Sequence, residues 1–300
     1  MKILVPIDFS DFSDNACRYA LSLAQQTKSE LHLITSVSIP LDWAYSTLGA
    51  GSHVATMPAD ALISEMPNFE HAKTSATQKL QAYAEELPDH ELNIVTETVV
   101  GFPWEQIIAY ASDKNIELIV MGTHGTSGLN EFLIGSNAEK VVRFAECPVL
   151  TVRDKINYPT IKNMVFASTF YGETERAFPR IKNIADRFGA HLYLLKVITP
   201  NAFETTRYTK KLMTDFAHAQ QLTNYSIHCY NESSVEKGVL NFAEDEKVDL
   251  ISIETHGRKG LSRLFVGSIA EDITNHAQRP VLTVKIEEAP RSYGVLFPGS

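Results

Sequence analysis

The chain has 300 residues, of which 44% are hydrophobic and 21% charged, a composition typical of globular proteins with room for two domains. Its net charge of −9 argues against nucleic-acid partners. Three scattered cysteines argue against a disulfide framework or a structural zinc site, and no metal site is expected. The sequence shows neither a signal-peptide pattern nor an apolar run of about 18 residues. We therefore expect a cytoplasmic protein without a membrane partner.

In chain order, the first part of the sequence alternates strands with helices. Residues 2–7 are a short apolar run typical of a buried strand, and residues 13–27 carry alanines at helical spacing with Ser13 or Asp14 as candidate N-cap. The pattern further predicts strands at 30–37, 92–100, 117–121 and 148–152, and helices at 70–86, 104–114 and 137–145. This alternation predicts a parallel sheet with helices on both faces, in which ligands bind at the carboxyl ends of the strands.

The sequence then repeats itself. Residues 117–125 match 249–257 at an offset of 132 residues, and the opening 3–9 pairs with 164–170 at an offset of 161. Val37 is paired with Val197, at 160. The prediction is an α/β chain of two tandem Rossmann-like domains, each a five-stranded parallel sheet with helices on both faces, at residues 1–155 and 160–290. The first domain carries an insertion near 40–70, interpreted as a surface insertion, with a lid or a partner site as the alternative.

A glycine-rich motif follows the fourth predicted strand. Gly122, Gly125, Gly135 and Ser136 form the pattern G-x2-G-x9-G-S. Glycines allow positive φ and close backbone approach to a ligand, and the N–H groups that open the next helix favour an anion. The alternative is purely structural, because Ser136 and Glu139 have the spacing of a capping box.

This motif, together with the opening Ile-Leu-Val-Pro-Ile-Asp at 3–8 and the closing Cys-Pro-Val-Leu-Thr-Val at 147–152, resembles the universal stress protein family. The resemblance covers both repeats. It implies an adenine nucleotide, ATP with or without Mg²⁺, with adenine held at the ends of the first two strands and ribose and phosphates held by the loop. The residues implied are Pro6, Asp8, Val37, Met121, Gly122, Gly125, Gly135, Ser136 and Asn137.

The second repeat departs from this pattern. Thr169 stands in place of Asp8, and Glu254 in place of Gly122, where a carboxylate would repel phosphate. The second loop nevertheless carries cations that the first loop lacks: Arg258, Lys259 and Arg263. We therefore expect one nucleotide per chain, in the first half, and at most an anion in the second. The candidate anion residues are Gly257, Gly267 and Ser268.

The predicted function is that of an ATP-binding stress-response protein that signals through conformation or an unknown protein partner and hydrolyses ATP slowly at most. A nucleotide-independent interaction scaffold is the alternative. An adenylating enzyme is disfavoured because the sequence contains neither SGGxDS nor HxGH, and no catalytic residue is assigned. The short apolar strands 149–152 and 281–284 are expected to pair the two halves into an intramolecular pseudo-dimer, with a further homodimer left open.

Overall fold

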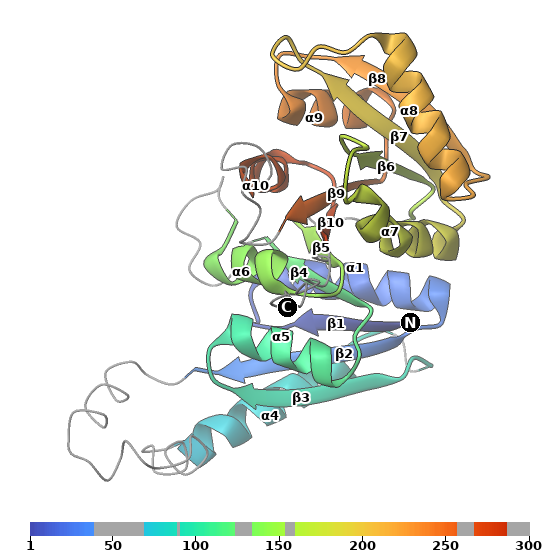
Figure 1. Cartoon of the computed structure of the whole chain (residues 1–300). Helices are drawn as coiled ribbons and strands as arrows, with labels where there is room; N and C mark the ends of the chain where they lie inside the picture. Colours follow the sequence, from blue (N-terminus) through green and yellow to red (C-terminus); the bar gives the residue numbers. More distant parts are fainter. Residues whose placement is uncertain (39–68, 89–90, 124–133, 154–159, 257–266, 287–300) are drawn as a thin grey trace, which may run out of the picture.

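The computed structural model describes residues 1–38, 69–88, 91–123, 134–153, 160–256 and 267–286 (Figure 1). The insertion expected near 40–70 falls almost entirely outside these residues. The elements of the first half are β1 (Lys2–Pro6), α1 (Asp11–Thr27), β2 (Glu30–Val37), α4 (Phe69–Glu85), β3 (Ile94–Val100), α5 (Pro103–Asp113), β4 (Leu118–Gly122), α6 (Ser136–Phe144) and β5 (Val149–Val152). Those of the second half are β6 (Asn163–Ala167), α7 (Thr174–Phe188), β7 (His191–Ile198), α8 (Thr206–Ala219), β8 (Tyr225–Asn231), α9 (Val235–Asp245), β9 (Leu250–His256), α10 (Gly267–His276) and β10 (Val281–Ile286).

The two halves share one ten-stranded sheet with the order β3-β2-β1-β4-β5-β10-β9-β6-β7-β8. Within each half all strand pairs are parallel, as the alternation of strands and helices predicted. At the centre β5 and β10 pair antiparallel, with Leu150 opposite Leu282. The prediction that these two strands join the halves within one chain is confirmed (Figure 1).

Helices cover both faces of this sheet. On one face, α1 and α4 of the first half and α7 and α8 of the second pack over a single buried cluster, to which both halves contribute. On the other face, α5 with α6 and α9 with α10 each cover a separate cluster. Strand residues alternate between these clusters, as shown by Ile3 on the shared face and Leu4 on the opposite one. Among the residues that the structure describes, none of the helices is long and apolar enough to span a bilayer.

The strand register corrects one pairing made from the sequence. Pro6 pairs with Ile34 in the first half, and Ala167 with Leu195 in the second, so both strands keep one offset of 161 residues. The counterpart of Val197 is therefore Ser36, and pairing Val197 with Val37 was wrong by one residue. Two identical valines are a weaker guide to structural equivalence than a continuous ladder of backbone hydrogen bonds.

Two helix starts also differ from the predictions. Helix α1 begins at Asp11 with Ser10 as its cap, whose hydroxyl accepts a hydrogen bond from the Ser13 amide at 3.2 Å. Ser13 and Asp14 therefore lie inside the helix. Helix α6 has Gly135 at its N-cap and no side-chain cap, so Ser136 is the first helical residue and the capping-box interpretation was wrong.

Candidate functional site

A cavity of about 700 Å³ lies at the carboxyl ends of the first-half strands, within the size range of small-molecule sites. Of the nine residues predicted to bind the nucleotide, it is lined by Pro6, Asp8, Met121, Gly122, Gly135, Ser136 and Asn137. Val37 is not among the lining residues, whereas its neighbours Ser36 and Ser38 are. Gly125 lies outside the described residues. Residues from four separate parts of the first half therefore meet at one cavity.

Asp8 lies in the turn between β1 and α1. One oxygen of its carboxylate, Oδ1, accepts hydrogen bonds from the Ser10 amide at 3.0 Å and the Ser10 hydroxyl at 2.6 Å. The intervening Phe9 has φ of 62°, a left-handed conformation that turns the chain sharply. The side chain of Asp8 is exposed. The turn thus holds a carboxylate at the cavity while the same carboxylate supports the cap of α1.

Gly122 ends β4 directly against the first turn of α1. A Cβ at this position would lie 2.8 Å from the carbonyl oxygen of Phe12 and 2.9 Å from its carbonyl carbon. These are backbone atoms, which cannot rotate away as a side chain could. Close approach of the two backbones therefore explains why glycine stands at the floor of this cavity.

The amino end of α6 forms another wall. The amide of Gly135 donates to the carbonyl oxygen of Thr123 at 2.6 Å, which ties the start of α6 to the end of β4. The first N–H groups of a helix have no acceptor within the helix, and the N-cap residue Gly135 has no side chain to cap them. Ser136 and Asn137 are exposed at the cavity. The amino end of α6 therefore offers amide donors and a positive dipole end to an anion.

The second half supports this wall. Asn275 of α10 is 7% exposed, and its side-chain oxygen accepts a hydrogen bond from the Ile134 amide at 2.7 Å, one residue before the N-cap of α6. The carbonyl oxygen of Asn275 accepts a second bond, from Arg153 at 3.0 Å. Residues from the second half thus fix the backbone that leads into the candidate anion site of the first.

Two further sets of residues line the cavity and were not predicted. The first set is apolar and forms a slot between the sheet and α5; it consists of Ile34, Val99 and Ile107. The second set comes from α4, where His71, Ser75 and Lys79 stand four residues apart and so share one helix face. Their spacing was visible in the sequence and would have placed them together on this helix.

Lys79 supplies a positive charge that the glycine-rich motif lacks. Its ammonium group lies 3.9 Å from the centre of the Phe9 ring, beside Asp8. Phe9 also contacts Tyr83 edge to face, at 6.3 Å between ring centres. The aromatic pair therefore positions a cation at the cavity although the predicted loop contains none.

The corresponding position of the second half is built differently. Glu254 occupies the place of Gly122, and its carboxylate accepts hydrogen bonds from Ser168 at 2.8 Å and Thr174 at 2.7 Å. Helix α7 begins at Thr174, the counterpart of Ser13, two residues later than α1 begins. The later start leaves room for a side chain where the first half needs glycine. Of the candidate anion residues, Gly257 lies outside the described residues, and Gly267 and Ser268 begin α10.

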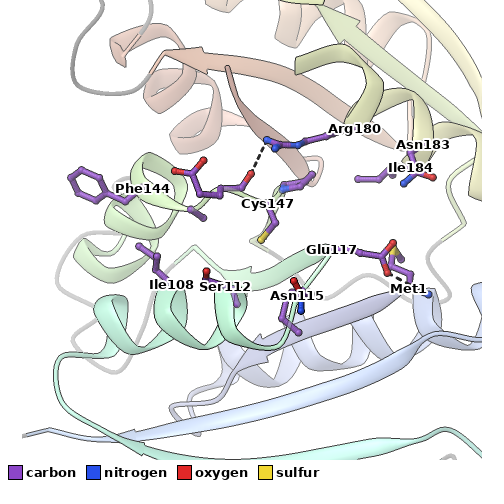
Figure 2. A pocket seen from close by; sticks show the side chains of 15 residues that line it. Met1, Ile108, Ser112, Asn115, Glu117, Phe144, Cys147, Arg180, Asn183 and Ile184 are labelled. Carbon is purple, nitrogen blue, oxygen red and sulfur yellow. Dashed lines mark hydrogen bonds and ion pairs between the residues drawn. The ribbon is translucent and has the colours of Figure 1, made fainter. Parts of the chain in front are cut away.

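A further cavity of about 490 Å³ lies between the halves, at the amino ends of β1, β4 and β5 (Figure 2). Met1, Glu117 and Pro148, which precede β1, β4 and β5, line it together with Cys147 and Arg180. Burial raises the pKa of the Cys147 thiol to about 11, so this thiol stays protonated near neutral pH. Of the predicted site residues that the structure describes, none lines this cavity. Across the described residues, no group of three or more His, Cys, Asp or Glu side chains could hold a metal ion.

The fold and the first-half cavity define a tandem α/β protein with a cavity at the carboxyl ends of its first-half strands. Comparison with protein families agrees with this class, because the model of the universal stress protein family matches residues 1–153 and again residues 160–285. The chain therefore belongs to the universal stress protein family.

Individual relatives match either one half or the whole chain. A universal stress protein of Methanocaldococcus jannaschii, MJ0531, is 36% identical over 155 residues, which are 51% of this chain and 81% of that protein. A universal stress protein of Mycolicibacterium smegmatis is 23% identical over 299 residues, covering 94% of this chain and 96% of its own. The crystal structure of a universal stress protein from Archaeoglobus fulgidus has a TM-score of 0.71 and 17% identity, and the alignment covers 95% of this chain and 98% of that one. The tandem arrangement is thus shared along the full length.

Proposed function

We propose that the first half binds an adenine nucleotide, with ATP as the expected ligand, with or without Mg²⁺. The observation that carries this proposal is the cavity itself, which gathers Asp8, the apolar slot and the amino end of α6 around one volume. The chain then acts in a stress response by changing conformation or partner binding with nucleotide occupancy. We expect an affinity in the micromolar range, about −8 kcal/mol.

The chemistry of the walls divides the proposed ligand into two ends. Ile34, Val99 and Ile107 offer an apolar slot for the base, and the Asp8 carboxylate at its edge accepts hydrogen bonds from an exocyclic amino group. The amides at Ser136 and Asn137 and the Lys79 ammonium suit the phosphates, because both supply positive charge. An ion bound with the phosphates would supply further charge neutralisation.

The test is to substitute Asp8 and compare it with its second-half counterpart. Asp8→Ala removes the proposed base contact and should weaken ATP binding by roughly 1–3 kcal/mol, or about fivefold to 150-fold. Thr169→Ala makes the matched change in the second half and should leave the affinity unchanged. The ATP affinity of both variants is measured by thermophoresis with the full chain. Asp8→Asn keeps an acceptor oxygen for Ser10, so it separates recognition of the base from support of α1.

Equal ATP affinity in wild type and both Asp8 variants would contradict the assignment. Absence of ATP binding in the wild-type chain would favour the alternative, a nucleotide-independent interaction scaffold. For the second half we propose no nucleotide and at most an anion at Gly267 and Ser268. The Glu254 carboxylate supports this asymmetry, because it lies where the first half has Gly122 and would repel a phosphate group.

A further inference from the structure

We propose that the second half binds a small, uncharged and largely apolar molecule in the cavity that corresponds to the nucleotide cavity of the first half. This second-half cavity has a volume of about 340 Å³, roughly half that of its first-half counterpart. It lies at the carboxyl ends of β6, β7 and β9, beneath α9 and α10. Its aliphatic lining consists of Ala167, Leu195, Val197, Ala202, Val235, Val239, Ile253, Ile269, Ala270 and Ile273.

Comparison of the two cavities shows where polar groups have been replaced. The strand register makes Val197 the counterpart of Ser36, and the offset of 132 makes Ile269 the counterpart of Asn137. All four residues line their respective cavities. Two hydrogen-bonding side chains at the first cavity have therefore become aliphatic side chains at the second. An aliphatic surface gains from an apolar ligand and leaves the polar groups of a nucleotide without partners.

Among the described residues that line this cavity, the one lysine is already paired with a carboxylate. Lys196 is 6% exposed, and its ammonium lies 2.8 Å from a carboxylate oxygen of Glu204. The other oxygen of Glu204 accepts a hydrogen bond from the Tyr171 hydroxyl at 2.9 Å, and the ammonium also lies 4.1 Å from the centre of the Tyr171 ring. Separating this pair would leave a charge buried without its partner, which is costly. An anionic ligand thus gains little from Lys196.

The carboxylate of Glu254, which also lines this cavity, is a second reason why an anionic ligand is disfavoured. One of its oxygens accepts hydrogen bonds from the Ser168 and Thr174 hydroxyls. Together with the Lys196–Glu204 pair, the formal charge of these side chains is negative. This charge disfavours an anion, and the aliphatic walls favour an uncharged ligand, because burying a charged group against aliphatic side chains is costly.

The aromatic residues near the second-half cavity and the volume of this cavity restrict the class of ligand further. Tyr171 lines the cavity and is 43% exposed, while Phe203, between the lining residues Ala202 and Glu204, is 76% exposed. The partly exposed Tyr171 ring in the cavity lining favours contact with an apolar or aromatic molecule. An apolar cavity of about 150 Å³ accommodates benzene, so 340 Å³ has room for a molecule of two fused rings.

The proposal is tested with 2-naphthol, a neutral two-ring probe, and 2-naphthoate, its charged analogue, titrated into the full chain by fluorescence. We expect saturable binding of 2-naphthol and at least tenfold weaker binding of 2-naphthoate. Ile269→Asn restores the first-half residue and should weaken 2-naphthol binding at least fivefold. The reciprocal control, Asn137→Ile in the first half, should not weaken it.

A second pair of variants separates the cavity from general effects on folding. Ala270→Leu fills the second-half cavity and should abolish binding, whereas Ala138→Leu makes the matched change in the first half and should not, with thermal unfolding confirming that each variant is folded. Lack of saturable binding by wild type, unchanged affinity in Ile269→Asn and Ala270→Leu, or equal affinity for 2-naphthoate would overturn the proposal. No step uses a nucleotide, so the result is independent of ATP binding in the first half.

Discussion

At Gly122 a single hydrogen atom in place of a side chain sets the shape of the first-half cavity. The α-carbon of this residue faces the carbonyl group of Phe12 at the start of α1, and a Cβ would come within 2.8 Å of its oxygen. Gly122→Ala should therefore destabilise the folded chain by about 1–3 kcal/mol, because the backbone of α1 has to move. Urea unfolding measures the change, and an unaltered free energy of unfolding would show that α1 yields without cost.

We expect His32 to make the stability of the first half depend on pH. It lies buried on β2, with one ring nitrogen 2.8 Å from the Tyr110 hydroxyl. Burial lowers the pKa of His32, and the nearby Glu30 carboxylate opposes this shift only in part. Below its ordinary pKa of about 6.5, the unfolded chain therefore binds a proton that the folded chain excludes.

The folded state should accordingly lose stability as pH falls from about 6.5 towards the lowered pKa of His32. His32→Gln removes this titration, so its free energy of unfolding should change less between pH 7.5 and pH 5.5 than that of wild type. Urea unfolding at both pH values provides the comparison. The same pH dependence in the two proteins would mean that His32 does not contribute.

At the scale of elements, the start of α6 depends on a helix from the other half. Asn275 of α10 accepts the Ile134 amide at 2.7 Å, and Ile134 leads directly into the N-cap Gly135. Asn275→Ala leaves that amide without its acceptor and should weaken ATP binding several-fold, at a cost of about 1 kcal/mol. Asn275→Asp keeps an acceptor oxygen and should retain most of the affinity. If the alanine variant binds ATP as well as wild type does, α10 does not position this site.

The elements also show what the sequence could predict. Strand positions and their parallel pairing followed from buried apolar runs alternating with helical periodicity, and the short apolar runs at 149–152 and 281–284 predicted the pairing of β5 with β10. Helix starts were less predictable, because Ser10 rather than Ser13 caps α1 and Gly135 rather than Ser136 caps α6. The choice between neighbouring polar residues depends on local backbone geometry, which composition does not determine.

The candidate site was likewise predicted only in part. The described residues of the glycine-rich motif line one cavity, as expected. Lys79 lines the same cavity and was missed, although its helical spacing from His71 and Ser75 was visible in the sequence. The hydrogen bond that the Ile134 amide donates to the Asn275 side chain joins residues 141 positions apart, one in each half. No local pattern indicates such a contact, because it depends on how β5 and β10 pair. A further homodimer of two such chains remains an open possibility of the sequence-based prediction.

At the scale of the whole molecule, duplication has produced one continuous sheet with two unlike cavities. The seam is symmetric, with Leu150 opposite Leu282 in an antiparallel pair. The cavities differ, because one combines Asp8, Gly122 and a helix start with glycine at its N-cap, while the other contains Glu254, the Lys196–Glu204 pair and aliphatic walls. We therefore propose nucleotide binding for the first half, and for the second half support of the α6 start and binding of a separate, uncharged ligand.

The most direct test of this asymmetry is calorimetric titration of ATP into the purified, nucleotide-free full-length chain. We expect a single class of site with one ATP per chain and a dissociation constant in the micromolar range, which corresponds to a binding free energy of about −8 kcal/mol. Two equivalent sites per chain would mean that Thr169 and Glu254 are tolerated at a nucleotide site. Either that result or the absence of saturable heat would contradict the proposal of one nucleotide site per chain, in the first half.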